Sequence, residues 1–430
     1  MARKSLLLLF CLCVCAPFCF GQGTTTWVID TVVGGAIYDG LPATQTPLNM
    51  PNGLWIDRDG ALWVAEMGNH VIRRMDPATG IMRVVVGGGT ILDDAIPVPG
   101  LSVRLERPSH LTGDAAGNLY FTDSANNRVR KLTPDGLVTT VVGTGQAGFS
   151  GDGGLARFAR LSAPTGLAFD AVGNLFVADG GNCRIRRVDT AGIISTYAGN
   201  GQCQQSGDGG PALNAGFPSQ TFLDGMQGLA FDSKGSLYVA ANTIRRIERG
   251  TGIITTVVGI PNQVSYGSIP DGSLAATSAM ASPIGMLFDQ QDNLYFTYSS
   301  GLAKVDANTG LVTNFGGNWQ GAGIARDAAG RWVFAATYYG QILQAGAAPG
   351  KLAIIAGSNE PFDGVARLAV LSLPVGMGTD ARGNVYVGES PLGRVRQLDP
   401  ATGRITTVLG GGSTPKADGV AATAASLGNI

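Results

Sequence analysis

Short apolar stretches separated by glycine-rich turns recur along the whole chain. In the copy at residues 164–199, GLAFD and NLFVAD are apolar runs that predict two short strands. RIRRVD alternates charged and apolar positions, as a half-buried strand does, and IISTYAG contains the β-branched residues that strands favour. The Asp-x-x-Gly segments between these runs favour tight turns. The pattern therefore predicts four antiparallel strands in each repeat.

This four-strand repeat occurs seven times, with an aspartate at the same place in every copy. Four antiparallel strands at a period of roughly 40–55 residues are typical of a β-propeller blade, and neighbouring blades must stack to bury their faces. We predict an all-β fold, a single β-propeller over residues 22–430 with seven blades, six and eight being the alternatives. The copies start near residues 51, 108, 164, 226, 283, 321 and 374, and their aspartates are Asp57, Asp114, Asp170, Asp232, Asp289, Asp327 and Asp380.

A second element, an Asp-Gly turn followed by alanine or leucine, lies between most copies, and its tail predicts one helical turn lying over the ring. At the other end of the pattern, WVIDTVVGG at 27–35 matches a fourth strand without the first three. The chain thus holds one fourth strand and one connector more than seven blades need. Three arrangements stay open: residues 27–35 close the ring in place of residues 405–409, an eighth blade is partial, or the array is cut short. The connectors lie at 38–43, 150–156, 206–212, 270–275, 362–366 and 417–421, with a degraded form at 93–94.

The first residues read as a targeting signal. Two basic residues precede an apolar run at 6–20, and small residues follow, which predicts a secretory signal peptide over residues 1–21. A retained membrane anchor is the alternative, although the run is short for a spanning helix and no later segment is long enough to span. We expect a secreted or periplasmic protein, in which the two cysteines outside the signal, Cys183 and Cys203, form a natural disulfide pair.

Charge argues against nucleic acid as a partner. Charged residues make up 14% of the chain, the net charge is −1, and no basic tract is present. Nucleic-acid binding therefore lacks its electrostatic footprint. The arginines of the third strands alternate with apolar residues and have acids nearby, so we interpret them as positions near the rim of the blades.

Three segments resemble the NHL repeat, which is named for its Asn-His-Leu triplet: GNHVIRR at 68–74, NNRVRKL at 126–132 and NCRIRRVD at 182–189. The opening P-x-G-h-x-x-D followed by G-N, where h is an apolar residue, also matches. The resemblance covers nearly the whole mature chain and is weakest in the sixth copy, which lacks the asparagine and the basic third strand. It implies an exported, bacterial-type NHL β-propeller, and it brings in NHL-like lyases, which use a three-histidine zinc site.

The chain has two histidines, too few to supply that zinc site. His70 stands in the triplet of the first copy, and His110 replaces the glycine of the first strand in other copies. Both fall at connections that share one face of a propeller, so a functional histidine pair is geometrically allowed. Two surface or edge histidines are the simpler interpretation.

The repeated carboxylates are interpreted as structural. Asp123 and Asp179 end second strands, and Arg128 and Arg184 begin the third strands that follow, so an ion pair or a turn cap within the blade explains them. The connectors carry a single aspartate beside glycine, not the alternating acids of a calcium loop. We therefore expect no catalytic residue, no metal site and no cofactor.

The sequence favours a binding or interaction scaffold for a protein or carbohydrate ligand, with no membrane span after signal cleavage. A lactonase- or lyase-like propeller enzyme is one alternative, and a structural cell-surface assembly module is the other. Propellers gather variable loops on one face around the central channel, so residues that break the repeat there are the candidates for ligand contact. These candidates are His70, His110, Gln227, Tyr298, Trp319, Tyr338 and Tyr339.

Overall fold

The computed structural model falls into two compact units, residues 39–357 and a second unit that includes residues 358–430. It describes residues 39–430 except 93–95, 219–225, 266, 281, 316–320, 328, 338–339, 346–351, 358–363, 366–373, 381, 391–392, 403, 411–420 and 424–430. The expected signal peptide at 1–21 and the expected strand at 27–35 lie outside the described residues. We describe each unit by itself.

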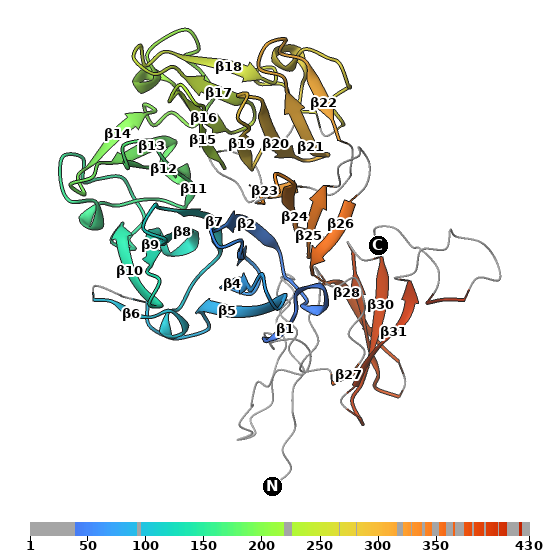
Figure 1. Cartoon of the computed structure of the whole chain (residues 1–430). Helices are drawn as coiled ribbons and strands as arrows, with labels where there is room; N and C mark the ends of the chain where they lie inside the picture. Colours follow the sequence, from blue (N-terminus) through green and yellow to red (C-terminus); the bar gives the residue numbers. More distant parts are fainter. Residues whose placement is uncertain are drawn as a thin grey trace, which may run out of the picture. The chain divides into compact units, whose positions relative to one another are not determined.

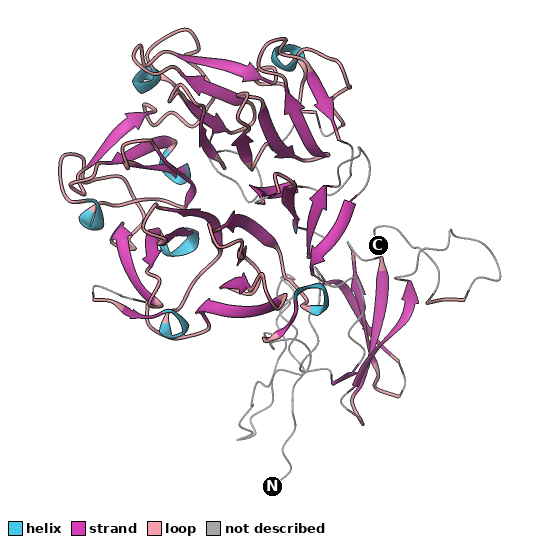
Figure 2. Cartoon of the chain, viewed as in Figure 1, coloured by secondary structure: helices cyan, strands magenta, loops and turns pink. Residues whose placement is uncertain are grey.

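Seven four-stranded antiparallel sheets follow one another along the chain, as the repeat pattern predicts (Figures 1 and 2). In each sheet the strands pair in chain order, and the first strand of six of them lines the centre of the larger unit. The first sheet has β2 (Pro51–Ile56), β3 (Leu62–Glu66), β4 (Val71–Met75) and β5 (Ile81–Gly87), and the second has β7 (Pro108–Gly113), β8 (Leu119–Asp123), β9 (Arg128–Leu132) and β10 (Leu137–Val142). The third has β11 (Pro164–Phe169), β12 (Leu175–Asp179), β13 (Arg184–Val188) and β14 (Ile194–Ala198), and the fourth has β15 (Leu229–Phe231), β16 (Leu237–Ala240), β17 (Ile244–Ile247) and β18 (Ile254–Val258). The fifth has β19 (Met286–Phe288), β20 (Leu294–Tyr298), β21 (Gly301–Val305) and β22 (Val312–Asn314), and the sixth has β23 (Gly321–Arg326), β24 (Trp332–Ala336), β25 (Gln341–Ala345) and β26 (Leu352–Ala356). The seventh has β28 (Pro374–Thr379), β29 (Val385–Glu389), β30 (Arg394–Asp399) and β31 (Arg404–Gly410).

The aspartate common to the repeats caps the turn between the first and second strands. Asp170 Oδ1 accepts the backbone N–H groups of Val172 and Asn174 at 3.1 and 2.8 Å, and Oδ2 accepts the Asn174 side chain at 2.6 Å. The same set of bonds recurs at Asp114 and Asp289. An aspartate that bonds the backbone two and four residues ahead fixes a tight turn, which explains its recurrence without any catalytic role.

Five connectors form a short 3₁₀ turn that lies against a fourth strand, as the alanine- and leucine-containing tails predict. The N–H of Gly143, after β10, donates to Ala156 O at 3.0 Å, and the N–H of Gly199, after β14, donates to Ala212 O at 2.9 Å. Short strands of the connectors also pair with the outer edge of the fourth strand, which protects that edge from pairing with other chains. The turns are η1 (Ala43–Gln45), η2 (Gly100–Ser102), η4 (Ala156–Phe158), η6 (Ala212–Asn214) and η7 (Ala275–Thr277), and the edge strands are β1 (Leu41–Pro42), β6 (Val98–Pro99) and β27 (Gly364–Val365).

Neighbouring sheets pack through aromatic side chains and through glycines close to the centre. A Cβ on Gly228 would lie 2.0 Å from Ile284 O of the next sheet, so only glycine allows this approach of the two first strands. Farther along the strands, an aromatic residue of one second strand meets a phenylalanine of the next first strand edge to face, an arrangement that aromatic rings prefer. These pairs are Tyr120–Phe169 at 4.9 Å, Phe176–Phe231 at 5.0 Å and Tyr238–Phe288 at 4.7 Å between ring centroids.

The sixth sheet packs against the first in the same way as consecutive sheets pack elsewhere. Ser124 Oγ of the second sheet donates to Pro164 O of the third at 2.7 Å. Thr337 occupies the equivalent place in the sixth sheet, and its Oγ1 donates to Pro51 O of the first sheet at 2.9 Å. The interface between the last and first of these six sheets therefore repeats the bond of an internal interface.

The connector before the first sheet completes this closure. The N–H of Gly357, after β26, donates to Ala43 O in η1 at 2.9 Å, the bond that the other connectors make with the sheet before them. Apolar residues of the first and sixth sheets, among them Leu54 and Ile342, share one buried cluster. Residues 39–357 thus form a closed ring of six sheets, which we call the six-sheet ring.

The seventh sheet belongs to the other unit and has the same internal design. Its buried Arg396 forms an ion pair with Glu389 at 3.5 Å, and the N–H of Gly410 donates to Ala422 O at 2.8 Å. Residues 405–409 lie in β31 and pair with β30, so they occupy the fourth-strand position of this sheet. Closure of a ring by residues 27–35 remains a prediction.

Candidate functional site

A groove with a volume of about 920 Å³ lies between the first and second sheets of the six-sheet ring. Two half-buried indoles, Trp55 and Trp63, stand opposite each other on β2 and β3 with ring centroids 6.1 Å apart. Val85, Leu101 and Pro134 add apolar surface from both sheets and from the connector. A volume of this size with mixed apolar and polar walls is typical of ligand-binding clefts.

A single glycine sets this groove apart from the groove between the second and third sheets. Phe169 of the third sheet fills the space beside Tyr120, whereas the equivalent residue of the second sheet is Gly113. Trp55 occupies that space instead, because a Cβ on Gly113 would lie 2.0 Å from its ring. Both aromatic residues at this interface therefore come from the first sheet, and the second sheet leaves its side of the groove open.

Charged groups line the rim of the groove. Trp63 Nε1 donates to Asp57 Oδ2 at 2.8 Å, and the Arg74 guanidinium lies 5.7 Å from the Trp63 ring centroid and 4.0 Å from Asp57. Burial raises the pKa of Asp114, but hydrogen bonds from Asn118 outweigh it and hold the pKa below its ordinary value. The rim thus presents fixed charges of both signs around an apolar floor.

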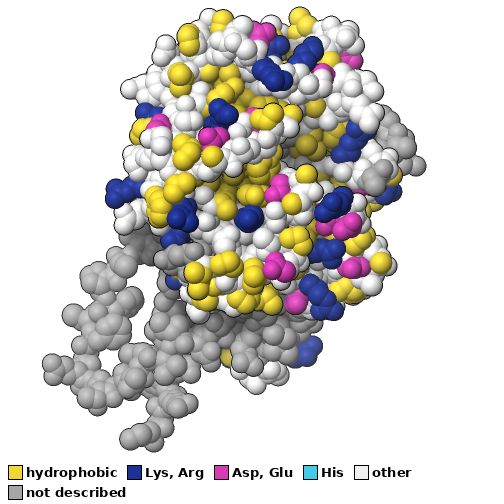
Figure 3. All heavy atoms as spheres, turned by 60° about the vertical axis from the view of Figure 1, so that its left-hand side comes forward, with side chains coloured by type: hydrophobic (Ala, Val, Ile, Leu, Met, Phe, Trp, Pro, Cys, Tyr) yellow, Lys and Arg dark blue, Asp and Glu magenta, His cyan; other side chains and the backbone are white. Residues whose placement is uncertain are grey.

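The connector between these two sheets exposes aliphatic side chains beside the groove. Leu101, which lines the groove from η2, has 59% of its surface exposed, and Ile96 in the same connector has 73% exposed. Figure 3 shows hydrophobic side chains gathered in patches between scattered charged residues on one face of the molecule. An exposed apolar cluster with a polar rim is typical of a surface that binds a partner.

The structure places the two histidines in different surroundings. His70 Nδ1 accepts the backbone N–H of Arg107 at 3.0 Å, and its Nε2 lies 3.8 Å from Glu106 at the surface. His110 lines the central channel, where burial lowers its pKa to about 4 and its Nδ1 accepts the Leu167 N–H at 3.4 Å. Each histidine makes its own contacts between neighbouring sheets, and the described contacts do not join the two.

Two more candidates for ligand contact are buried. Tyr298 has no exposed surface, and its hydroxyl accepts the Ile269 N–H at 3.2 Å and the Asn314 side chain at 3.1 Å. Gln227 is 8% exposed in the lead-in to β15. Their burial places both side chains inside the ring, where a ligand on the surface would not reach them. Trp319, Tyr338 and Tyr339 lie outside the described residues.

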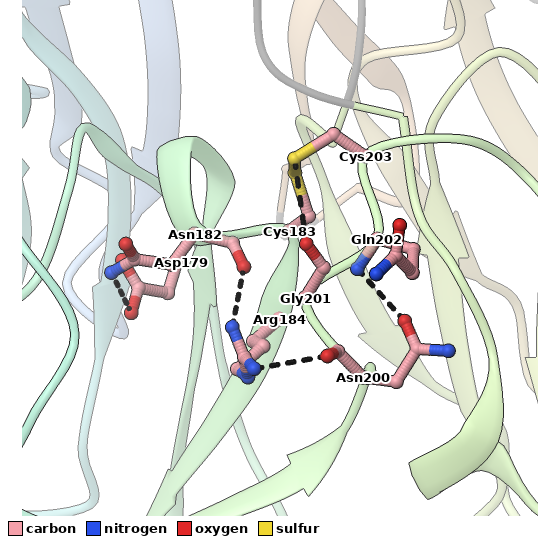
Figure 4. The surroundings of a disulfide bond; sticks show 8 residues. All are labelled: Asp179, Asn182, Cys183, Arg184, Asn200, Gly201, Gln202 and Cys203. Atoms are coloured by element: carbon pink, nitrogen blue, oxygen red, sulfur yellow. Dashed lines mark hydrogen bonds between the residues drawn. A yellow bond between two sulfur atoms is a disulfide. The ribbon is translucent and has the colours of Figure 1, made fainter.

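The structure joins Cys183 and Cys203 in a disulfide, with the Cα atoms 5.3 Å apart (Figure 4). Cys183 follows η5 (Gly180–Asn182) with a left-handed backbone, φ 54°, in the position that His70 and Asn127 hold in the first two sheets. Those residues bond the backbone in front of the next sheet: the Ala163 N–H donates to Asn127 Oδ1 at 2.9 Å. In the third sheet a covalent bond to the following connector takes the place of that hydrogen bond.

Asp123 and Asp179, which end second strands, form buried ion pairs, but not with the arginines expected. Asp123 pairs with Arg130 at 2.8 Å and Asp179 pairs with Arg186 at 3.3 Å, two residues beyond Arg128 and Arg184. Asp123 stands opposite Arg128 in the strand register, yet the long side chain of Arg130 reaches back to it across the same face of the sheet. The expected pairing with Arg128 and Arg184 is therefore wrong by one step of two residues.

Burial governs the electrostatics of these acids. It raises the pKa of Asp179 to about 6, while hydrogen bonds from the Ser162 N–H at 2.7 Å and the Asn182 side chain at 2.8 Å favour the charged form. Asn182 is the first residue of the NHL-like triplet, so this asparagine ties the turn to the acid. Every partner is a structural group of the same sheet.

Arginine and threonine side chains also engage the connector aspartates. Asp152 accepts Arg186 at 2.6 Å and Thr196 at 2.7 Å, and Asp208 accepts Arg245 at 2.5 Å. Arg245 and the other central arginines of the third strands are fully buried. Among the described residues, no group of three or more His, Cys, Asp or Glu side chains is arranged to hold a metal ion.

The sequence interpretation missed Trp55, Trp63 and Gly113 as a set. The signal for Gly113 lies in the position directly before the repeat aspartate, which is phenylalanine in three copies and glycine at Gly113. A second break at this repeat position, Arg326, was also missed and lies on the channel. Both become visible only when this position is compared across the repeats.

Comparison with known proteins supports this repeat pattern. A family profile described as the teneurin NHL domain matches residues 145–206. The Arabidopsis thaliana protein SUPPRESSOR OF QUENCHING 1, chloroplastic, is 33% identical over 159 residues, 35% of this chain and 15% of that protein. Teneurin-m of Drosophila melanogaster is 31% identical over 175 residues, 37% of this chain and 6% of that protein. The match thus spans a small part of the length of these relatives.

Among solved structures, a streptogramin B lyase superposes with a TM-score of 0.45 at 16% sequence identity, covering 85% of this chain and 94% of that one. In the part of the chain that the structure describes, no helix has the length and apolar character needed to span a membrane.

Proposed function

Because this chain is an NHL-repeat protein, we propose that it is an exported propeller that binds a protein partner through the groove between the first and second sheets. The observation that carries the proposal is the groove itself: two facing indoles and an arginine at an open interface, beside exposed aliphatic residues. Tryptophan and arginine are the residue types that most often dominate the binding energy of protein interfaces. A carbohydrate ligand is the alternative occupant of the same groove.

Export is the second part of the proposal. The disulfide supports it, since disulfides persist in oxidising compartments such as the periplasm and the extracellular space. Mass spectrometry of the protein recovered from producing cells should find a mature N-terminus at Gln22 and no free thiol. An intact N-terminus in a cytosolic fraction would contradict export.

The groove is tested with two variants that carry the same leucine-to-aspartate substitution at equivalent positions of two different connectors. Leu101 and Leu213 are both the middle residue of a connector turn, in η2 and η6, and both are about half exposed at 59% and 53%. L101D puts a charge into the groove, whereas L213D puts the same charge on an equivalent turn elsewhere on the ring. Neither change removes a buried side chain, so both variants should fold.

The assay starts from proteins that the immobilised chain retains from the culture medium, followed by titration calorimetry with the purified partner. L101D should weaken binding at least tenfold, and L213D should bind as the wild type does. Equal loss in both variants, or none in either, would place the partner on another surface. A retained glycan whose binding L101D alone abolishes would replace the protein partner by a carbohydrate.

A further inference from the structure

The centre of the six-sheet ring holds a further cavity, with a volume of about 430 Å³. The first strands of all six sheets line it, so it is the central channel of the ring (Figure 1). A cavity of this volume falls in the range that accommodates a small organic ligand.

The channel walls are apolar almost throughout. Leucine, isoleucine or methionine occupies the same buried position in each of the six first strands, from Leu54 in the first to Ile324 in the sixth. Phe169, Phe231 and Phe288 add aromatic surface two residues farther along three of these strands. Such walls favour the apolar body of a ligand, because burial of apolar surface is the main driving force of binding.

Arg326 is the one residue with a permanent charge among the described residues that line the channel. It stands where the third, fourth and fifth sheets carry phenylalanine, so it breaks the repeat at the channel itself. Its Nε donates to a backbone carbonyl, Gly330 O, at 3.1 Å, and its guanidinium lies 5.1 Å from the Trp332 ring centroid. Neither contact neutralises the charge, and the side chain is exposed.

No acidic side chain faces Arg326 from the channel lining, where the other polar side chains are Thr112 and His110. Burial lowers the pKa of His110 to about 4, so this side chain is neutral near pH 7. His110 replaces the small glycine of the other first strands and narrows the channel. A cation beside apolar, low-dielectric walls attracts an anion more strongly than the same cation does in open water, since these walls focus its electric field. Arginine binds a carboxylate through two parallel N–H···O bonds.

We propose that the central channel binds a small amphipathic carboxylate, with its apolar body between the first strands and its carboxylate on Arg326. The channel shares Trp55 and Ile56 with the protein-binding groove, but its other lining residues are its own, and this proposal does not depend on the groove. The chemistry defines the ligand class: a monoanion with an aliphatic or aromatic body, as opposed to a polar sugar or a multiply charged phosphate.

The test uses the full chain, decanoate as the probe, and decanol as its uncharged twin. Titration calorimetry should show decanoate binding at least tenfold more tightly than decanol. R326Q should abolish that preference, while R331Q should leave it unchanged, because Arg331 is exposed in the same turn and pairs with Asp327 outside the channel. R326F, which restores the residue of three other sheets, should fold with an unchanged melting temperature and bind both probes alike.

Three results would overturn the proposal. Decanoate and decanol binding equally to the wild type would remove the role of the charge. A decanoate affinity unchanged in R326Q and R326F would place the anion elsewhere. Loss of decanoate binding in R331Q as well would show a general surface charge effect. The L101D variant should bind decanoate normally, so failure of the groove proposal and failure of this one are distinguishable.

Discussion

Replacing both disulfide cysteines with alanine should lower the free energy of unfolding by about 3 kcal/mol. Cys183 and Cys203 are 20 residues apart in sequence, and closing a loop of that length removes about 3 kcal/mol of conformational entropy from the unfolded chain. The buried side chain of Cys183 adds a smaller packing loss. Urea unfolding followed by circular dichroism, without reductant, measures the difference between the wild type and C183A/C203A.

A second variant separates the cross-link from the backbone. Cys183 has φ 54°, a left-handed conformation that asparagine accepts more readily than alanine, and asparagine stands at the equivalent position of the second sheet. C183N/C203A should therefore be more stable than C183A/C203A by about 1 kcal/mol, although both lack the disulfide. A loss below about 1 kcal/mol in C183A/C203A would refute the entropic reasoning. Equal midpoints for the asparagine and alanine variants would show that the turn relaxes without the bond.

Three further predictions concern the ring. H110G installs the glycine of the other first strands and removes a histidine whose pKa burial lowers to about 4 from 6.5. Between these two pH values the unfolded state binds more protons than the folded state, so the wild type should lose up to about 3 kcal/mol of stability as the pH falls from 6.5 to 4, and H110G should not. Parallel pH profiles of the urea midpoints of the two proteins would contradict this. D123A should cost about 3 kcal/mol or more in thermal and urea unfolding because it removes the carboxylate that forms the ion pair with the buried Arg130. D123A/R130L, which has the alanine and leucine of the sixth sheet at these two positions, should recover most of that loss, and a double variant no better than the single one would count against a pairing penalty. A chain of residues 39–357 should unfold in one cooperative transition and resist proteolysis; an aggregated or molten product would show that the six sheets do not close stably alone.

Much of the fold follows from the sequence because each blade is built from local signals. The repeat aspartate marks a turn that its own backbone bonds create, and the Asp-Gly connectors mark the 3₁₀ turns. The seven sheets follow directly from these signals. The number of sheets in one ring does not, because it depends on contacts such as that between Thr337 and Pro51, which are 286 residues apart. No local pattern encodes which two interfaces meet.

The candidate sites were harder to predict for a related reason. His110 was singled out because it breaks the repeat, and the structure places it on the channel. Tyr298 also breaks the repeat, but it fills the space that an acid and an arginine share in other sheets, so its change is internal packing. The groove depends on which repeat position of one sheet lies opposite which repeat position of the next sheet. Trp55 and Gly113 lie in different repeats and become partners only across that interface.

The closure of the six-sheet ring by Thr337 and by the bond from Gly357 to Ala43 has a topological consequence. The seam between the sixth and first sheets carries the same bonds as an internal seam, so the ring has no inherent first blade, and its two chain ends lie beside one another. A circular permutant that links residue 357 to residue 39 and opens the chain at another connector would keep every inter-sheet contact, since exposed turns tolerate new termini. Placing the new ends beside η2 or η6 would deliver a fused domain to the mouth of the groove or away from it.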